Sequence, residues 1–262
     1  MTHMRGRARI EAAMRKSGRK KLAVFCTAGF PEADDTGRVI LALSQGGVDL
    51  IEIGVPFSDS LVDGPTIQMS NERALHNGMT LRKLLAQVHA VRERTAVPLI
   101  LMSAFNPILQ FPVEQFLQEA VRAGIDGTIV PDLPVEVYLE SYRPAFEQSG
   151  LPLIFLITAR TEPERIRYLD TLTGGILYVV SAEAVTGTSA ALDPEHERFF
   201  EELGQMELSS RLLAGFGISD RASFEHATRH LDGAVIGSAF IRALLEPGDL
   251  EEKAARFARS IR

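Results

Sequence analysis

The chain has 262 residues, of which 45% are hydrophobic, and a formal net charge of −6. This length is enough to bury a large core and is typical of one barrel domain, so we expect residues 1–262 to form a single domain. Cys26 is the only cysteine, which excludes an intrachain disulfide and a cysteine-based metal site.

The charge is distributed unevenly along the chain. Residues 1–21 contain eight Lys or Arg residues and one Glu, whereas the rest is acidic. A basic N-terminal segment could contact nucleic acid or act as a targeting presequence, but the spacing of Ile10, Ala13 and Met14 favours a helix that covers one end of the core. No apolar run reaches the roughly 20 residues that cross a bilayer. We therefore expect a cytoplasmic protein with no nucleic-acid or membrane partner.

Short β-branched runs alternate with stretches of helical periodicity along the whole chain. This alternation is typical of right-handed βαβ units and a parallel sheet. Eight strands is the number that a closed barrel needs, so the sequence predicts an α/β fold, a single (β/α)8 TIM barrel with an extra N-terminal helix. A doubly wound open sheet is the alternative. The predicted strands are 22–27, 50–54, 98–102, 127–131, 153–157, 176–180, 211–215 and 233–236, and the predicted helices are 34–46, 80–94, 113–123, 135–149, 163–172, 194–203, 219–230, 238–245 and a final helix within 249–262.

The second predicted strand carries one carboxylate among apolar residues. Alternation along a strand places Leu50, Glu52 and Gly54 on one face and Ile51 and Ile53 on the other. Glu52 is therefore expected to be buried. A buried carboxylate without a cation shifts its pKa, and because this strand contains no Lys or Arg, we interpret Glu52 as a proton donor or acceptor.

An acid-rich loop follows this strand. Residues 55–64 contain Asp59 and Asp63, and in parallel barrels the reacting groups lie at the carboxyl ends of strands and in the loops that follow. No Lys or His falls at such a position, which disfavours a Schiff-base aldolase and a metal-dependent lyase, and no Ser-His-Asp arrangement is visible. The remaining candidates are Glu52, Asp63 and, more distantly, Asp132.

Glycine-containing turns follow the last two predicted strands. Gly215 and Gly217 follow the seventh strand, and Gly237 and Ser238 follow the eighth and open a helix. Such barrels commonly bind phosphate with the backbone N–H groups at these two turns, although glycine is also an ordinary turn residue. Their joint placement predicts a phosphorylated substrate. After the sixth strand, residues 181–189 have the composition of a mobile lid or of an ordinary surface loop.

From about residue 9 to residue 245 the chain resembles the alpha subunit of tryptophan synthase. The most specific match is the run EIGVPFSDSLVDGPTIQ, which begins at Glu52 and ends at Gln68. One glycine pair would be a weak signal, but the ordered set is specific. The further matches are Leu101-Met102, Asn106-Pro107, VPDLP at 130–134, Tyr178 before Ser181, VTG at 185–187, GFGI at 215–218 and Gly237-Ser238.

The resemblance implies a lyase of tryptophan biosynthesis that cleaves indole-3-glycerol phosphate to indole and glyceraldehyde 3-phosphate. It also implies an alpha2beta2 complex in which indole passes to a beta subunit that carries pyridoxal phosphate, with no cofactor or metal in this chain. Glu52 would be the general acid-base that protonates indole C3 and takes the glycerol hydroxyl proton, and Asp63 would hydrogen-bond the indole N–H and stabilise the cationic indolenine.

The resemblance also implies which residues bind substrate. Two groups are expected, one at each end of the pocket. Phe25, Ile67, Leu101 and Tyr178 would line the indole end, although each also suits plain core packing. The phosphate end would be formed by Gly187, Gly217, Gly237 and Ser238, shaped by Phe216 and Val235, while Thr186 would close onto Asp63.

Several positions depart from the family's usual pattern. Ser60 stands where proline is usual, Val62 where alanine is usual and Ala184 where glycine is common, and Ala104-Phe105 occupies a site where tyrosine is frequent. The changes at 60 and 62 bear on coupling to a beta subunit, because that loop faces the partner in this family. Two alternatives stay open beside the coupled lyase: a catalytically slow regulatory partner, against which the presence of both carboxylates argues, and a stand-alone lyase that releases indole.

Overall fold

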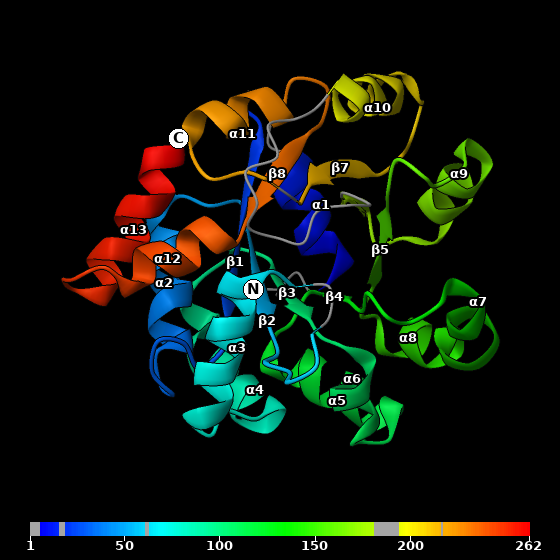
Figure 1. Ribbon diagram of the computed structural model, residues 1–262. Coiled ribbons are helices and arrows are strands. Elements are labelled where there is room, and N and C mark those ends of the chain that lie inside the picture. The colour runs from blue at the N-terminus through cyan, green and yellow to red at the C-terminus, as the bar shows by residue number, and fades with distance from the viewer. Residues whose placement is uncertain (1–5, 16–18, 61–62, 181–193, 216) are drawn as a thin grey trace.

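Eight parallel strands form a closed barrel in the order β1 to β8 (Figure 1). The structure is a computed structural model, and it describes residues 6–15, 19–60, 63–180, 194–215 and 217–262. Pairing of β1 with β8 completes the barrel, so the predicted TIM barrel is confirmed. The strands are β1 (Lys21–Thr27), β2 (Leu50–Gly54), β3 (Leu99–Met102), β4 (Gly127–Ile129), β5 (Leu153–Ile157), β6 (Ile176–Val179), β7 (Arg211–Ala214) and β8 (Gly233–Ile236).

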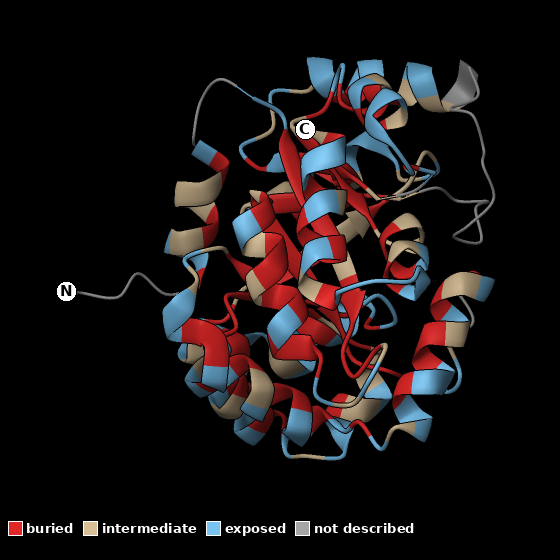
Figure 2. Cartoon of the chain, turned by 90° about the vertical axis from the view of Figure 1, so that its left-hand side faces the viewer, coloured by how far each residue is buried: buried red, intermediate tan, exposed pale blue. Residues whose placement is uncertain are grey.

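Helices surround the barrel and cover the outer faces of its strands (Figures 1 and 2). In the described part of the chain no helix has the length and apolar character needed to span a membrane. The helices are α1 (Arg7–Arg15), α2 (Thr36–Gly46), α3 (Pro65–His76), α4 (Leu81–Val91), α5 (Phe105–Leu109), α6 (Val113–Ala123), α7 (Val135–Val137), α8 (Arg143–Ser149), α9 (Pro163–Leu172), α10 (Pro194–Gln205), α11 (Arg221–Ala227), α12 (Ser238–Leu245) and α13 (Leu250–Ile261), with a 3-10 turn η1 (Arg92–Arg94) and a π-helical turn η2 (Tyr138–Tyr142).

The core has two layers because alternate residues of each strand face opposite sides of the barrel wall. Ile51 and Ile53 belong to the outer layer, between strands and helices. The inner layer fills the barrel and includes Leu50, Ile100, Ile129, Ile154, Ile176, Tyr178, Leu213 and Val235.

Helix α1 closes the amino-terminal end of the barrel. Its Ile10 and Met14 are buried in the inner layer. Arg9 of this helix donates to Asp126 Oδ1 at 2.8 Å, just before β4 begins. The expected helix in the basic N-terminal segment is confirmed, and the carboxyl ends of the strands remain as the mouth of the barrel.

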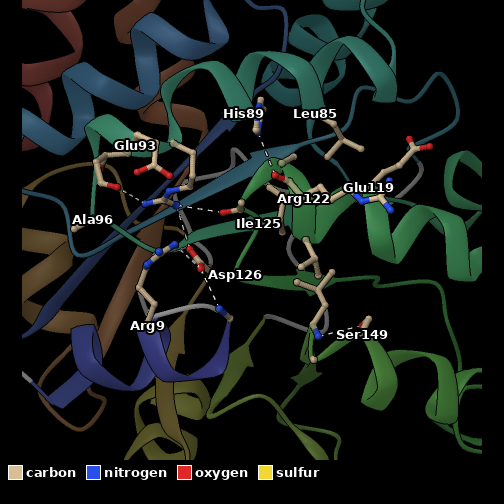
Figure 3. A pocket seen from close by; sticks show the side chains of 18 of the residues that line it. Arg9, Leu85, His89, Glu93, Ala96, Glu119, Arg122, Ile125, Asp126 and Ser149 are labelled. Atoms are coloured by element: carbon tan, nitrogen blue, oxygen red, sulfur yellow. Dashed lines mark hydrogen bonds and ion pairs between the residues drawn. The ribbon is translucent and has the colours of Figure 1, made fainter. Parts of the chain in front are cut away.

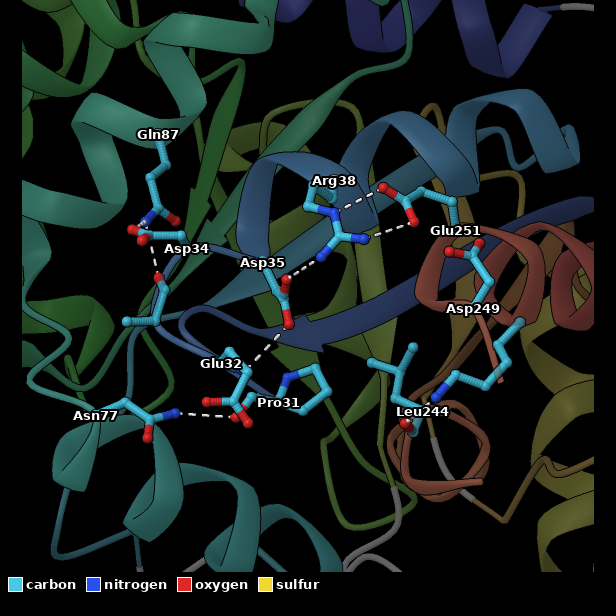
Figure 4. A network of polar contacts seen from close by, with 12 residues as sticks. Pro31, Glu32, Asp34, Asp35, Arg38, Asn77, Gln87, Leu244, Asp249 and Glu251 are labelled. Carbon is cyan, nitrogen blue, oxygen red and sulfur yellow. Dashed lines mark hydrogen bonds and ion pairs between the residues drawn. The ribbon is translucent and has the colours of Figure 1, made fainter. Parts of the chain in front are cut away.

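The final helix, α13, packs outside the barrel against α2. Arg38 of α2 connects the two elements: its guanidinium donates to both carboxylate oxygens of Glu251, at 2.6 and 2.7 Å, and to Asp35 at 2.8 Å (Figure 4). The loop after β1 is held from the other side by Asn77, which donates to the carbonyl oxygen of Pro31 at 2.9 Å. These contacts attach the C-terminal helix to the first βα unit.

The structure differs from the predicted helices at three places. Helices α3 and α5 were not predicted, although Pro65 in the first turn of α3 is a recognised helix start signal. The predicted helix 135–149 is divided into α7, η2 and α8. Pro144 lies in the first turn of α8 and has no backbone N–H, so a regular α-helical hydrogen bond cannot form there.

Glycines and side-chain caps mark several helix termini. Gly47, Gly124 and Gly150 follow their helices with φ between +70° and +94°, the left-handed conformation in which glycine carries no steric penalty. Asp220, and not Ser219, caps α11 in a capping box with Ser223.

Candidate active site

The central residue of the mouth is Glu52, which faces into the barrel from β2. Its register partners on the two adjacent strands are Phe25 on β1 and Ile100 on β3. The residue is 2% exposed, and its Oε2 atom has no hydrogen-bond partner among the described residues. The strand alternation predicted from the sequence is therefore observed, and it places a carboxyl group in apolar surroundings.

Burial controls the protonation of Glu52. Desolvation disfavours the charged form and raises the pKa of this carboxyl group from 4.5 to about 8. At neutral pH the group is consequently mostly protonated. A carboxylic acid with a pKa near the working pH can both donate a proton and take one back.

Asp63 lies in the loop that connects β2 to α3, directly before the helix N-cap Gly64. Burial raises the pKa of its carboxyl group, while hydrogen bonds from Ser60 and Asn71 lower it. The Asn71 amide is 3.4 Å from Asp63 Oδ2. Asp63 therefore has donors that favour its anion, whereas Glu52 has none at Oε2, and the two acids have different environments.

Tyr178 on β6 lies within the electrostatic influence of both acids. Burial raises the pKa of its hydroxyl group well above 10, and the charges of Glu52 and Asp63 raise it further. Glycine at position 215 makes room for the ring, because a Cβ atom there would lie 2.3 Å from Tyr178 Cζ.

Phe25 is accommodated in the same way on the other side of the mouth. A Cβ atom at Gly54 would lie 2.5 Å from Phe25 Cζ. The two strand-terminal glycines, Gly54 and Gly215, thus let aromatic rings lie against the barrel wall where a larger residue would collide with them. The result is a mouth with two aromatic rings and two acids.

The part of the mouth next to β1 is formed by β8 and the start of α12. Val235 faces the inner layer, and α12 begins at Ser238 immediately after Gly237, with no side-chain cap at its N-terminus. Gly217, in the turn after β7, has φ +67°. A helix N-terminus next to a glycine turn presents backbone N–H groups that bind anions.

Some predicted site residues lie elsewhere or outside the described residues. Leu101 packs in the core cluster that contains Ile51 and Ile53, whereas Ile100 and Met102 of the same strand pack in the inner layer. Ile67 is in the first turn of α3 and packs in the outer layer. Thr186, Gly187 and Phe216 lie outside the described residues, as do Val62 and Ala184.

Asp132 and Lys21 do not take part in the mouth chemistry described above. Asp132, the distant third carboxylate, accepts from the backbone N–H of Phe105 at 2.8 Å and so binds the first residue of α5. Lys21 is the first residue of β1 and is buried at the amino-terminal end, away from the mouth. The residue that sequence reasoning missed is Asn71, because α3 was not predicted and its buried face was unknown.

A hollow of about 1590 Å³ lies at the other end of the molecule, beside α1 (Figure 3). Asp126 lies in it and forms ion pairs with both Arg9, at 2.8 Å, and Arg92, at 3.2 Å. The carboxylate here is held by cations, unlike Glu52 at the mouth.

The fold and the mouth define a class: a TIM-barrel enzyme with a buried acid at the end of β2 and a second carboxylate in the next loop. A family model described as "Tryptophan synthase alpha chain" matches residues 12–261. The tryptophan synthase alpha chain of Flavobacterium johnsoniae is 47% identical over 230 residues, or 88% of this chain and 91% of the relative. This chain belongs to the tryptophan synthase alpha chain family, which is a family of lyases.

Solved structures agree with this assignment. The crystal structure of tryptophan synthase subunit alpha from Legionella pneumophila str. Paris matches with a TM-score of 0.87 at 31% identity, covering 99% of this chain and 97% of that chain. The tryptophan synthase complex from Pyrococcus furiosus contains a chain that matches with a TM-score of 0.81 at 31% identity, covering 92% and 97%.

Proposed function

We propose that this chain cleaves indole-3-glycerol phosphate to indole and glyceraldehyde 3-phosphate, with Glu52 as the acid-base and Asp63 as the stabilising anion. The observation that carries the proposal is the buried Glu52 carboxyl group, whose Oε2 lacks a partner among the described residues and whose pKa is about 8. Membership of the family supplies the reaction class.

The reaction needs the indole ring to become a leaving group. Protonated Glu52 donates its proton to indole C3, which gives an indolenine cation, and the Asp63 carboxylate accepts a hydrogen bond from the ring N–H and stabilises that positive charge. The Glu52 carboxylate then takes the proton of the glycerol hydroxyl group. A carbonyl forms, the carbon–carbon bond to C3 breaks, and its electron pair restores the aromatic ring, so Glu52 ends the cycle protonated.

The two ends of the substrate would bind at two parts of the mouth. Phe25 and Tyr178 would contact the indole ring, next to the two acids. The phosphate would bind the backbone N–H groups of the β8–α12 turn and the β7 turn, and Val235 would shape this end. The phosphate residues of the proposal are Gly187, Gly217, Gly237 and Ser238, with Phe216 beside them and Thr186 closing onto Asp63.

A beta subunit is the proposed partner, in an alpha2beta2 complex. Support comes from the family assignment and from the similarity to a chain of the tryptophan synthase complex from Pyrococcus furiosus. We expect pyridoxal phosphate in the beta subunit and no cofactor in this chain, and we expect the protein to act in the cytoplasm as a single domain.

The test is indole release by purified variants. Glu52→Gln keeps the shape of the side chain but removes proton transfer, so we expect indole formation to fall at least 10²-fold, within the range typical of general acid-base catalysis. Asp63→Asn should reduce it severely as well. The matched control is Glu225→Gln on α11, an exposed position, which should retain normal turnover. Near-normal turnover by Glu52→Gln would refute the assignment.

The role of the partner is tested with the same assay. Indole release is measured with and without a beta subunit. Strong activation supports the coupled enzyme, whereas full activity of the chain alone supports the stand-alone lyase.

A further inference from the structure

The acid-rich loop contains a small side-chain network whose members come from the loop and from α3. The Asn71 Nδ2 atom is 3.1 Å from Ser60 Oγ and 3.4 Å from Asp63 Oδ2. Ser60 in turn donates its hydroxyl hydrogen to the Asp63 carboxylate. Asn71 is 4% exposed, and it lies on the buried face of the helix that starts at Pro65.

We propose that Ser60 and Asn71 are positioning residues for Asp63, which together hold its carboxylate in one orientation and favour its ionised form. This inference deepens the proposed function and rests on it. Asn71 supplies two N–H groups from a fixed helix, and the Ser60 hydroxyl accepts one of them while donating its own hydrogen to the acid. We call Ser60 and Asn71 the Asp63 clamp.

Burial and the proposed role of Asp63 favour opposite protonation states, and the clamp favours the ionised one. Burial favours the neutral acid, but an anion is required to stabilise a cationic ring. Hydrogen bonds donated to a carboxylate favour its charged form, and charge-assisted bonds are stronger than neutral ones. Two donors also restrict rotation of the side chain, which a single bond to one oxygen would not do.

Gln68 of α3 holds the backbone of Ser60 and Asp63 by hydrogen bonds. Its Nε2 atom donates to the carbonyl oxygen of Asp63 at 2.9 Å and to that of Ser60 at 3.4 Å. The Asp63 N–H donates to the Ser60 carbonyl oxygen at 3.3 Å. The two residues are therefore held in a turn that brings their side chains together. A proline at position 60 could not supply the hydroxyl group.

Other charged or titratable groups belong to the acid-rich loop or to the elements next to it, and they are unchanged in the variants below. They come from four elements of the structure. They are Glu52 on β2, Tyr178 on β6, Asp59 in the same loop, bound by Ser58 at 2.6 Å, and Arg242 on α12, which donates to Thr66 at 3.3 Å in the first turn of α3.

The first measurement is a titration of Asp63 by carboxyl ¹³C NMR in the full chain, assigned with Asp63→Asn. Removing a donor should raise the pKa of Asp63 by about one unit in Ser60→Ala, because a hydrogen bond to a charged group is lost. Ser60→Thr keeps the hydroxyl group and should titrate like wild type. Ser58→Ala is the matched control, since it removes a hydroxyl group of the same loop that binds Asp59 instead.

The second measurement is the pH profile of kcat/KM for indole formation. In Ser60→Ala the acid limb should move to higher pH by the same amount as the pKa, and Ser60→Thr should restore it. Asn71→Ala should shift the acid limb in the same direction. Asn71 is buried, so this variant can fail to fold. Ser60→Ala changes a partly exposed loop residue and is then the decisive variant.

The outcomes separate the two proposals. If the pKa of Asp63 is the same in Ser60→Ala as in wild type, the clamp proposal is wrong. It is also wrong if the pKa of Asp63 rises but the acid limb of the kcat/KM profile stays in place. If Asp63→Asn keeps normal turnover, the proposed role of Asp63 in the reaction fails, whatever the titration shows.

Discussion

At the scale of single residues, the environment of Glu52 decides its chemistry. Phe25 and Ile100 lie beside it on the two adjacent strands. Burial raises the pKa of its carboxyl group to about 8, so the group stays protonated up to about that pH. Asp63, 11 positions along the chain, has donors from Ser60 and Asn71. The pKa of both carboxyl groups is raised by burial, but only Asp63 has hydrogen bonds that act against this shift, so the two acids differ in the way that an acid and a stabilising anion require.

The raised pKa of Glu52 makes stability depend on pH. The unfolded chain ionises this group near 4.5, but the folded protein holds the proton until about pH 8. The contribution of Glu52 to stability is therefore full below pH 4.5 and is lost between pH 4.5 and about 8, at about 1.4 kcal/mol per pH unit. Glu52→Gln lacks this loss, so its free energy of unfolding relative to wild type should increase across that window.

Urea denaturation at several pH values between 4 and 9 measures this difference. Titrations of all other groups are common to both proteins and cancel. Glu225→Gln, at an exposed position, should show no such trend. A wild-type minus Glu52→Gln difference that is the same at pH 5 and pH 8 would contradict the buried, unpaired acid.

At the scale of elements, the junction of β8 and α12 sets the proposed phosphate site. A Cβ atom at Gly237 would lie 3.5 Å from Phe25, an ordinary contact, so a small side chain fits there. Gly237→Asp should then act mainly through its charge, which repels a phosphate at the helix N-terminus. We expect the KM for indole-3-glycerol phosphate to rise by about tenfold or more, corresponding to at least about 1.4 kcal/mol.

Gly237→Ala is the control for size and should raise KM much less. The decisive comparison is with a substrate analogue that lacks the phosphate group, whose KM should change little in Gly237→Asp. Equal increases for both compounds would show that the junction does not bind phosphate.

At the scale of the whole molecule, a buried ion cluster joins the N-terminal helix to the barrel. Asp126 is 1% exposed and binds Arg9 of α1 and Arg92 of η1. It also accepts from the backbone N–H of Leu99 at 3.0 Å. Burial raises the pKa of Asp126 and lowers that of Arg92, and the opposite charges of the cluster act against both shifts.

Asp126→Asn should destabilise the protein by about 3–5 kcal/mol, because it leaves two partly or fully buried guanidinium groups without a counter-charge. The denaturation midpoint in urea measures this. Removing the exposed Arg221–Glu225 pair with Glu225→Gln should cost less than about 1 kcal/mol. If both variants unfolded at the same midpoint, the cluster would not anchor α1.

Sequence reasoning succeeded where the information is local. Period-2 alternation oriented Glu52 inward, because successive residues of a strand face opposite sides of the barrel wall. It did not reach the orientation of Leu101, which packs in the outer layer. Local pattern cannot choose between the faces of β3, where every residue is apolar, so the register with β2 and β4 decides.

Tertiary structure alone determined the rest of the site. The pairing of Arg9 with Asp126 spans 117 positions, and the closeness of Tyr178 to Glu52 and Asp63 follows from closure of the barrel. By itself the sequence determined which backbone conformations and which side-chain faces each segment prefers, because these depend on neighbours in the chain. Which segments meet, and which acid receives a donor, depends on contacts that exist only after the eight strands have closed.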